Sequence, residues 1–230
     1  MLKKLLIGLG LMVVAASSYA QQVKATDGLT IGFRTGISFT SAPNDLFTSG
    51  QQVSDNGTTG IDMGAGLILG YDWAVTDHIM LIPHVFGDYA ASITDMAYGP
   101  YYPVFNSLLN AQTNYGDVGA GLKVGYQFFN GLMPYVSADV AEVFQSTAWT
   151  VLGTSVSYNQ HMIRPIATVG LAYTFMLGDC GENTGSKACD INAQNKLAVG
   201  LQDRYIFPAG GDFKSINAVE FVTTFKFGMS

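Results

Sequence analysis

The chain has 230 residues, enough for one β domain of ordinary size. Only 12% of the residues are charged, about half the usual share in soluble proteins, and glycine is abundant, with 27 residues. The formal net charge of −6 excludes the basic surface that binds nucleic acid, so we expect no nucleic-acid partner.

Residues 1–20 differ in composition from the rest of the chain. Two lysines precede a short apolar run, and the sequence Ser-Tyr-Ala at positions 18–20 has the small-x-small pattern of a cleavage site. A membrane-anchoring helix needs about 20 apolar residues, and Ser17 interrupts the run before that length. We therefore expect residues 1–20 to be a cleaved Sec signal peptide and residues 21–230 to form the mature domain.

Apolar and polar residues alternate with a period of two through most of the mature chain, which is the pattern of strands with two unequal faces. The pattern predicts eight strands, each long enough to cross a membrane when tilted. In chain order we expect them at residues 29–40, 61–73 and 78–90, in a hairpin at 115–144, and at 161–177, 196–207 and 217–227.

The hairpin at residues 115–144 has the most regular alternation. Every second residue from 118 to 128 is apolar, and the residues between them are glycine, charged or polar. Asn130-Gly131 supplies a residue pair that tolerates positive φ, so the chain can reverse there. Because the return strand alternates again, we expect the two strands to pair and to share the same two faces.

The two unequal faces fit either a soluble barrel with an apolar lumen or a membrane barrel with a polar lumen. The polar faces carry much glycine, which suits a crowded narrow lumen better than a solvent-facing strand. The apolar faces carry almost no charge and end in aromatic residues at both ends, as expected in lipid. We therefore predict an all-β protein, an eight-stranded antiparallel up-and-down transmembrane β-barrel.

The polar faces also carry charges of both signs, and an eight-stranded barrel is just wide enough to be filled by side chains. We therefore predict that paired charges plug the lumen; a narrow pore for ions or small solutes is the alternative. The predicted lumen charges are Arg34, Asp62, Asp72, Asp88, Asp117, Lys123, Asp139, Arg164, Arg204, Glu220 and Lys226.

The connections at residues 41–60, 92–114 and 146–160 are long and polar and are predicted to be outer loops, the last with an extended hairpin tip as the alternative. The turns after the second and fourth strands are short. Short periplasmic turns with long extracellular loops are typical of outer-membrane barrels. The connection at 178–195 breaks this rule, because it is long on the predicted periplasmic side.

Two acidic residues and two prolines depart from the strand pattern. Asp203 and Glu142 fall on the lipid face, so we expect both near the outer interface or beside a bulge. Pro83 and Pro165 each remove one ladder hydrogen bond, and a closed barrel has no free edge to accommodate that loss.

Three segments, together with the eight alternating strands, resemble a known group: GLKVGYQF at 121–128, GLAYTFML at 170–177 and FVTTFKF at 221–227. They resemble the opacity-protein or OmpA-like superfamily of outer-membrane β-barrels from Gram-negative bacteria. The resemblance covers the mature chain and implies an outer-membrane location and insertion by the barrel-assembly machinery. Such proteins often end in an aromatic residue that this machinery reads, whereas here Phe227 is followed by three residues.

Cys180 and Cys189 are the two cysteines of the chain, and both lie in the polar connection after residue 177. In an exported protein such a pair is expected to form a disulfide. No histidine lies near them in the sequence, so we expect no metal site, and nothing else in the sequence indicates a cofactor.

Recognition is expected on the outer loops, because binding residues concentrate on loops that a rigid scaffold holds. Tyr98, Tyr101, Tyr102 and Phe105 form an aromatic cluster in one such loop, and tyrosine is enriched at interfaces. Local packing within the loop is the alternative. We expect a monomer in outer-membrane lipid, with a structural or adhesin-like role toward an extracellular ligand.

Catalysis has little support in the sequence. Lipid-modifying barrel enzymes use Ser/His chemistry at the outer rim, and this chain has no His-x-Ser arrangement. The nearest candidate is His161, close to Ser155 and Ser157. We therefore predict that the protein is not an enzyme.

Overall fold

The computed structural model describes residues 23–41, 59–93, 96–97, 109–151, 154–177, 195–209 and 215–228. The strands are β1 (Gly28–Ser41), β2 (Thr59–Ala74), β3 (Ile79–Ser92), β4 (Met96–Ala97), β5 (Leu109–Tyr126), β6 (Leu132–Val151), β7 (Thr154–Leu177), β8 (Asn195–Ile206) and β9 (Ile216–Gly228). Within the described residues no helix is long and apolar enough to cross a membrane.

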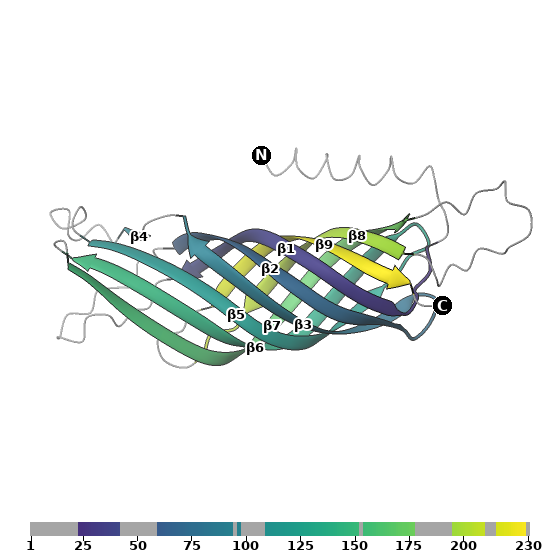
Figure 1. The fold of residues 1–230 in the computed structure, drawn as a ribbon, viewed down its shortest axis with the longest axis horizontal. Helices are drawn as coiled ribbons and strands as arrows, with labels where there is room; N and C mark the ends of the chain where they lie inside the picture. The colour runs from purple at the N-terminus through teal and green to yellow at the C-terminus, as the bar shows by residue number, and fades with distance from the viewer. Residues whose placement is uncertain are drawn as a thin grey trace, which may run out of the picture.

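The long strands form one antiparallel sheet that closes on itself (Figure 1). Each long strand pairs with its neighbours in sequence, and the pairing of β1 with β9 completes the circle. The two-residue β4 pairs with β5 only and is not a wall strand. The eight-stranded antiparallel up-and-down barrel predicted from the sequence is therefore confirmed.

The outer surface of the barrel is apolar and its interior is polar. On β2, Leu67 and Trp73 are 65% and 56% exposed, whereas Asp72 is buried. Arg164 and Arg204 are among the most deeply buried side chains of the described chain. A soluble barrel has the opposite arrangement, so the prediction of a lipid-facing exterior and a polar lumen is correct.

Aromatic side chains gather near both ends of the exterior. Neighbouring rings on one strand pack together at Tyr126–Phe128, Tyr173–Phe175, Phe225–Phe227 and, toward the opposite end, Tyr205–Phe207, with centroids 4.7–5.0 Å apart. Amphipathic rings favour the boundary between lipid and water, so these two belts agree with the predicted aromatic girdles.

The predicted reversal at Asn130-Gly131 is present between β5 and β6. Gly131 has a φ of 91°, and its N–H donates to the carbonyl of Phe128 at 3.0 Å. Its own carbonyl accepts from the N–H of Thr174 on β7 at 2.8 Å. Glycine adopts this backbone conformation without steric cost, which explains the residue at this position.

Two of the predicted loops are too long. β5 begins at Leu109, and most of residues 146–160 belong to β6 and β7, which pair as far as Val151 and Thr154. The loop interpretation of 146–160 is therefore wrong, and the extended hairpin tip is correct. The polar sequence of this hairpin hides its strands, because strands beyond the bilayer need no apolar face.

The two prolines lie where the ladders are already incomplete. Pro165 accepts at its carbonyl from the N–H of Phe207, so its missing donor faces β8, and β7 and β8 pair only from Ile166 onward. Opposite Pro83 the β2–β3 ladder is interrupted between the pairs Gly70–His84 and Trp73–Leu81. Each proline therefore lies where the ladder is already interrupted, so its missing N–H costs no regular ladder hydrogen bond.

Asp203 and Glu142 lie on the exterior, as the alternation predicts. Asp203 is three residues from the end of β8, on the side away from the short turns. Glu142 Oε1 lies 3.1 Å from Nδ1 of His161, and the β6–β7 register is continuous there. No bulge is therefore needed, and both carboxylates lie toward the predicted outer end.

Candidate functional site

All eleven predicted lumen charges are on the inner wall of the barrel. The structure adds Lys196, which is only 3% exposed. Sequence reasoning missed this lysine because it stands at the very start of its strand, although it shares the alternating face of Gln202 and Arg204. With Lys196 the described lumen holds six cations and six carboxylates, the eleven predicted charges plus one.

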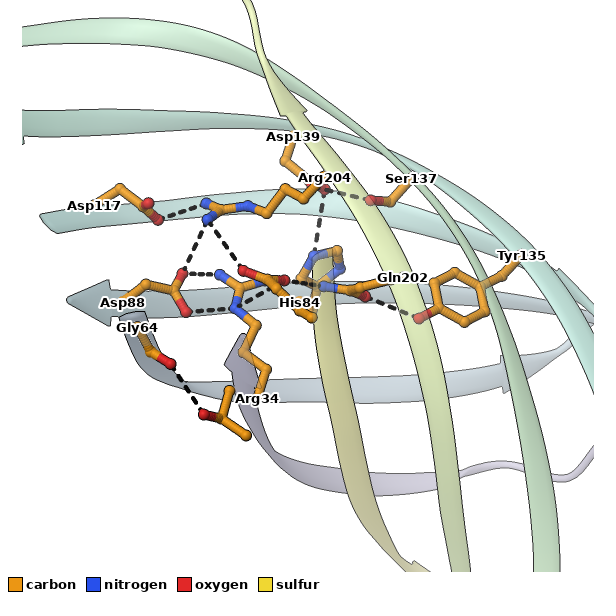
Figure 2. Close-up of polar contacts among 12 residues, drawn as sticks. Arg34, Gly64, His84, Asp88, Asp117, Tyr135, Ser137, Asp139, Gln202 and Arg204 are labelled. Carbon is orange, nitrogen blue, oxygen red and sulfur yellow. Dashed lines mark hydrogen bonds and ion pairs between the residues drawn. The ribbon is translucent and has the colours of Figure 1, made fainter. Parts of the chain in front are cut away.

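Two arginines and three carboxylates form the central charge cluster, which joins five strands of the wall (Figure 2). Arg34 on β1 binds both carboxylate oxygens of Asp88 on β3. Arg204 on β8 lies 2.6 Å from Asp117 on β5 and 3.6 Å from Asp88. Glu220 on β9 lies 3.9 Å from Arg34 and 3.8 Å from Arg204. The cluster therefore crosses the lumen.

The ring of Phe86 packs against both guanidinium groups. Its ring centroid lies 4.7 Å from Cζ of Arg34 and 5.1 Å from Cζ of Arg204. A cation over an aromatic face is stabilised most where water is excluded. Phe86 thus packs the cluster and takes the place of water within it.

Hydrogen bonds extend the cluster toward the opposite wall. Gln202 donates to Glu220, and its side-chain carbonyl accepts from the hydroxyl of Tyr135 at 2.8 Å. The ammonium of Lys123 lies 4.5 Å from the centre of the Tyr135 ring. These contacts connect the arginines to the β5–β6 hairpin.

Asp139 on β6 and His84 on β3 form a second contact, along the inner wall and over Gly121 of the intervening strand β5. Nε2 of His84 lies 3.3 Å from Oδ1 of Asp139, and the hydroxyl of Ser137 donates to Oδ2 at 2.9 Å. Both members of the pair are buried. The carboxylate therefore accepts a hydrogen bond at Oδ2 and lies beside the imidazole at Oδ1.

Glycines on the inner wall make room for these carboxylates. A Cβ at Gly66 would overlap the carboxylate of Asp88, and one at Gly121 would overlap that of Asp139. The high glycine content of the polar strand faces thus has a steric cause. Larger side chains there would displace the ion pairs.

Residues 23–27 close the end of the barrel that carries the short turns. The N–H of Val23 donates to Phe129 at 3.0 Å, and the N–H of Ala25 donates to Asp77 at 2.9 Å. These bonds tie the segment to both short turns, and its buried members face the lumen. We call residues 23–27 the mouth segment.

The mouth segment also accepts hydrogen bonds from lumen lysines. Lys226 donates to the carbonyl of Thr26 and lies 2.9 Å from Asp72. Lys196 donates to the carbonyl of Lys24 and to the hydroxyl of Thr26, each at 2.9 Å. The sequence did not predict this segment, because no alternation marks a segment that crosses the mouth of a barrel.

Asp62 and Arg164 lie apart from the central cluster. Asp62 is fully buried, opposite Ser38 of β1 in the β1–β2 register. Nε of Arg164 donates to the carbonyl of Phe207 at 2.8 Å, which fixes this arginine beside the end of β8. Both residues thus belong to the lumen wall near the predicted outer end.

The rim histidine named from the sequence, His161, lies on β7. His161 is exposed and contacts Glu142, and the neighbouring positions on the same strand face are Asn159 and Ile163. Ser157 is four residues away along an extended strand, which is about 13 Å. Within the described residues no group of three or more His, Cys, Asp or Glu is placed to hold a metal ion.

Several sequence predictions concern residues outside the described ranges and stay predictions. These are the signal peptide at 1–20, the disulfide between Cys180 and Cys189, and the aromatic cluster of Tyr98, Tyr101, Tyr102 and Phe105.

No protein-family model matches the chain, and no curated protein matches it either. Membership of the opacity-protein or OmpA-like superfamily therefore stays a prediction.

Among solved structures, the chain is similar to the Neisserial surface protein A, with 13% identity over 86% of this chain and 97% of that one, and a TM-score of 0.45. It is similar to Ail, the attachment invasion locus protein of Yersinia pestis, with 11% identity, coverage of 87% and 97%, and a TM-score of 0.39. It is also similar to the outer membrane enzyme PagL, with 12% identity, coverage of 85% and 97%, and a TM-score of 0.44.

Proposed function

We propose that this protein is a bacterial outer-membrane barrel that acts at the cell surface, in a structural or adhesin-like role, and is neither a pore nor an enzyme. The observation that carries the proposal is the central charge cluster. Five ionised side chains from five strands meet there, with a phenylalanine ring packed against the two arginines, so transport through the lumen would have to break buried ion pairs.

Little free space remains beside the cluster. The cavity lined by Arg34, Asp88 and Glu220 has a volume of about 10 Å³. That is room for about one water molecule. At the other end, the mouth segment crosses the opening between the two short turns. Both features support a plugged lumen and leave the outer end as the place where the protein acts.

The outer end carries a sheet that projects beyond the barrel wall. The β6–β7 ladder continues to Thr154, but β7 begins to pair with β8 only at Ile166, and the β3–β5 ladder ends at Tyr115 (Figure 1). Strands β5, β6 and β7 therefore reach farther than their neighbours. A rigid sheet of this kind is a suitable scaffold for surface recognition.

The location and the partners follow from the same proposal. The apolar exterior is solvated by outer-membrane lipid, and the barrel-assembly machinery inserts the chain. The closed sheet leaves no wall edge for pairing with a second copy, which supports a monomer. The ligand would be extracellular and would contact the predicted outer loops, one of which carries Tyr98, Tyr101, Tyr102 and Phe105 in the sequence.

Single-channel recording of the refolded protein in a planar bilayer tests the closed lumen. We expect no discrete conductance steps. Reproducible steps with an ion selectivity that changes on substituting Lys123 would show an open or gated pore and would refute the proposal.

Adhesion of bacteria that display the protein to a monolayer of eukaryotic cells tests the surface role. Replacing the four loop aromatics by serine should lower the number of bound cells. The matched control replaces the exposed, lipid-facing Tyr89 by serine, and it should leave binding unchanged. Equal adhesion of all variants and of cells without the barrel would contradict the role in recognition.

A further inference from the structure

A cavity of about 50 Å³ lies in the lumen next to the mouth segment. A cavity needs about 10–15 Å³ to hold one water molecule, so this cavity has room for a few waters or one small ion. Thr30, Gln127 and Thr174 contribute polar groups to its wall, and Ile68 and Ile82 contribute apolar ones. The cavity is thus polar and roomy enough for a solvated guest.

The charged groups that line the cavity are unequal in sign. Lys123, Lys196 and Lys226 face a single carboxylate, Asp72, and that carboxylate lies 2.9 Å from Lys226. The hydroxyl of Thr30 donates to the other oxygen of Asp72 at 2.7 Å. Asp72 is therefore satisfied, and it neutralises one lysine of the three.

The remaining charged groups of the wall are paired elsewhere. Lys24 lies 3.0 Å from the exposed Asp77 outside the lumen. His84 points at Asp139, 3.3 Å away. Neither Asp77 nor Asp139 lines the cavity, so its wall sets the three lumen lysines against one carboxylate.

Lys123 and Lys196 are the two lysines in question, and they are 8% and 3% exposed. Among the described residues, Lys123 has no hydrogen-bond or ion-pair partner, and its ammonium rests on the face of Tyr135. Lys196 donates to two neutral oxygens of the mouth segment, which leaves one of its three donors unused. Buried charges without a counter-charge are costly, and a bound anion removes that cost.

We propose that this cavity binds one small inorganic anion, of the size of chloride or phosphate, between the ammonium groups of Lys123 and Lys196. The mouth segment forms one wall of the site, at the end of the barrel that carries the short turns. This site is independent of what the outer loops recognise, and failure of the surface role would leave it unaffected. The six-to-six balance of the whole lumen does not replace the anion, because the other five carboxylates do not line this cavity.

Bromide is a direct probe for the anion, since it replaces chloride and scatters anomalously. Crystals of the full chain grown in bromide should show one anomalous peak in the cavity, within hydrogen-bond distance of Lys123 and Lys196. Waters alone in the cavity would overturn the proposal.

Urea unfolding in detergent micelles gives a second readout. At constant ionic strength, replacing gluconate by chloride or by phosphate should lower the unfolding equilibrium constant, by about 100-fold when the anion exceeds its Kd by 100-fold. Whichever of the two acts at the lower concentration is the occupant. No difference among the three salts would refute an anion site.

Matched lysine variants assign the effect to the cavity. Lys123→Met keeps most of the side-chain length without the charge, so the unfolding equilibrium constant should no longer depend on the anion. Lys24 lies in the same wall, but its ammonium pairs with Asp77 outside the lumen. In Lys24→Met the unfolding equilibrium constant should therefore still depend on the anion. If Lys123→Met does not fold, Lys196→Met replaces it. An anion effect of equal size in all the variants would place the binding elsewhere and overturn the proposal.

Discussion

Replacing Arg204 by methionine perturbs the closed lumen at its most buried point. The guanidinium of Arg204 is fully buried and lies 2.6 Å from Asp117, 3.6 Å from Asp88 and 3.8 Å from Glu220. Methionine keeps much of the side-chain volume and still packs on Phe86. The substitution therefore removes charge and hydrogen bonds and little packing.

The expected loss of stability follows from what the substitution leaves behind. Asp88 and Glu220 keep their contacts with Arg34, but Asp117 loses its one ion-pair partner among the described residues. Removing one partner of a buried pair costs about 3–5 kcal/mol, because the other charge stays desolvated. We expect a loss of this size, or roughly 10²–10⁴-fold in the unfolding equilibrium constant.

Urea unfolding in lipid vesicles, followed by tryptophan fluorescence, measures this loss. The double variant Arg204→Met, Asp117→Asn should recover part of it, because the abandoned carboxylate is then neutral. If the lumen were hydrated, Arg204 would be solvated and the loss would stay below about 1 kcal/mol, as for exposed ion pairs. That result, without recovery in the double variant, would refute the plugged lumen.

Three further predictions use the same unfolding assay. Gly131→Ala should cost about 1–2 kcal/mol, because alanine is strained at a φ of 91°. Gly66→Ala should cost about 1–3 kcal/mol by overlapping the carboxylate of Asp88, whereas Gly87→Ala, whose nearest neighbours would be 3.8 Å away, should change stability by less than about 0.5 kcal/mol. Reduction of the predicted disulfide between Cys180 and Cys189 should leave the barrel folded, and its loop should contribute about 2–3 kcal/mol; alkylation without reductant that labels both thiols would disprove the disulfide.

The period-two pattern was sufficient to predict the eight-stranded barrel, because one side of a membrane barrel wall is apolar and the other is polar. It placed each lumen charge on the correct face, including Arg164 and Arg204, but it could not say which carboxylate each would meet. Arg204 and Asp117 are 87 positions apart and meet only through the register of the closed sheet. Alternation assigns a face and carries no information on height along the barrel axis.

The period-two pattern failed to predict segments that do not have one face toward lipid and the other toward the lumen. The hairpin tip at 146–160 has no lipid face, and the mouth segment runs across the barrel and not along it, so neither has a period to detect. Lys196 was missed for the related reason that strand ends are the least certain part of any pattern.

The central charge cluster also constrains how the barrel enters the membrane. Arg34 on β1 meets Glu220 on β9, which are the first and last strands of the wall, and Asp88 on β3 contacts arginines of both β1 and β8. A partly inserted sheet would expose these ionised groups to hydrocarbon, since their partners arrive only when the ends of the sheet join. Closure and charge neutralisation are thus one event. The free energy of a partly inserted intermediate rises with the number of charges that it leaves unpaired. This favours all-or-none insertion.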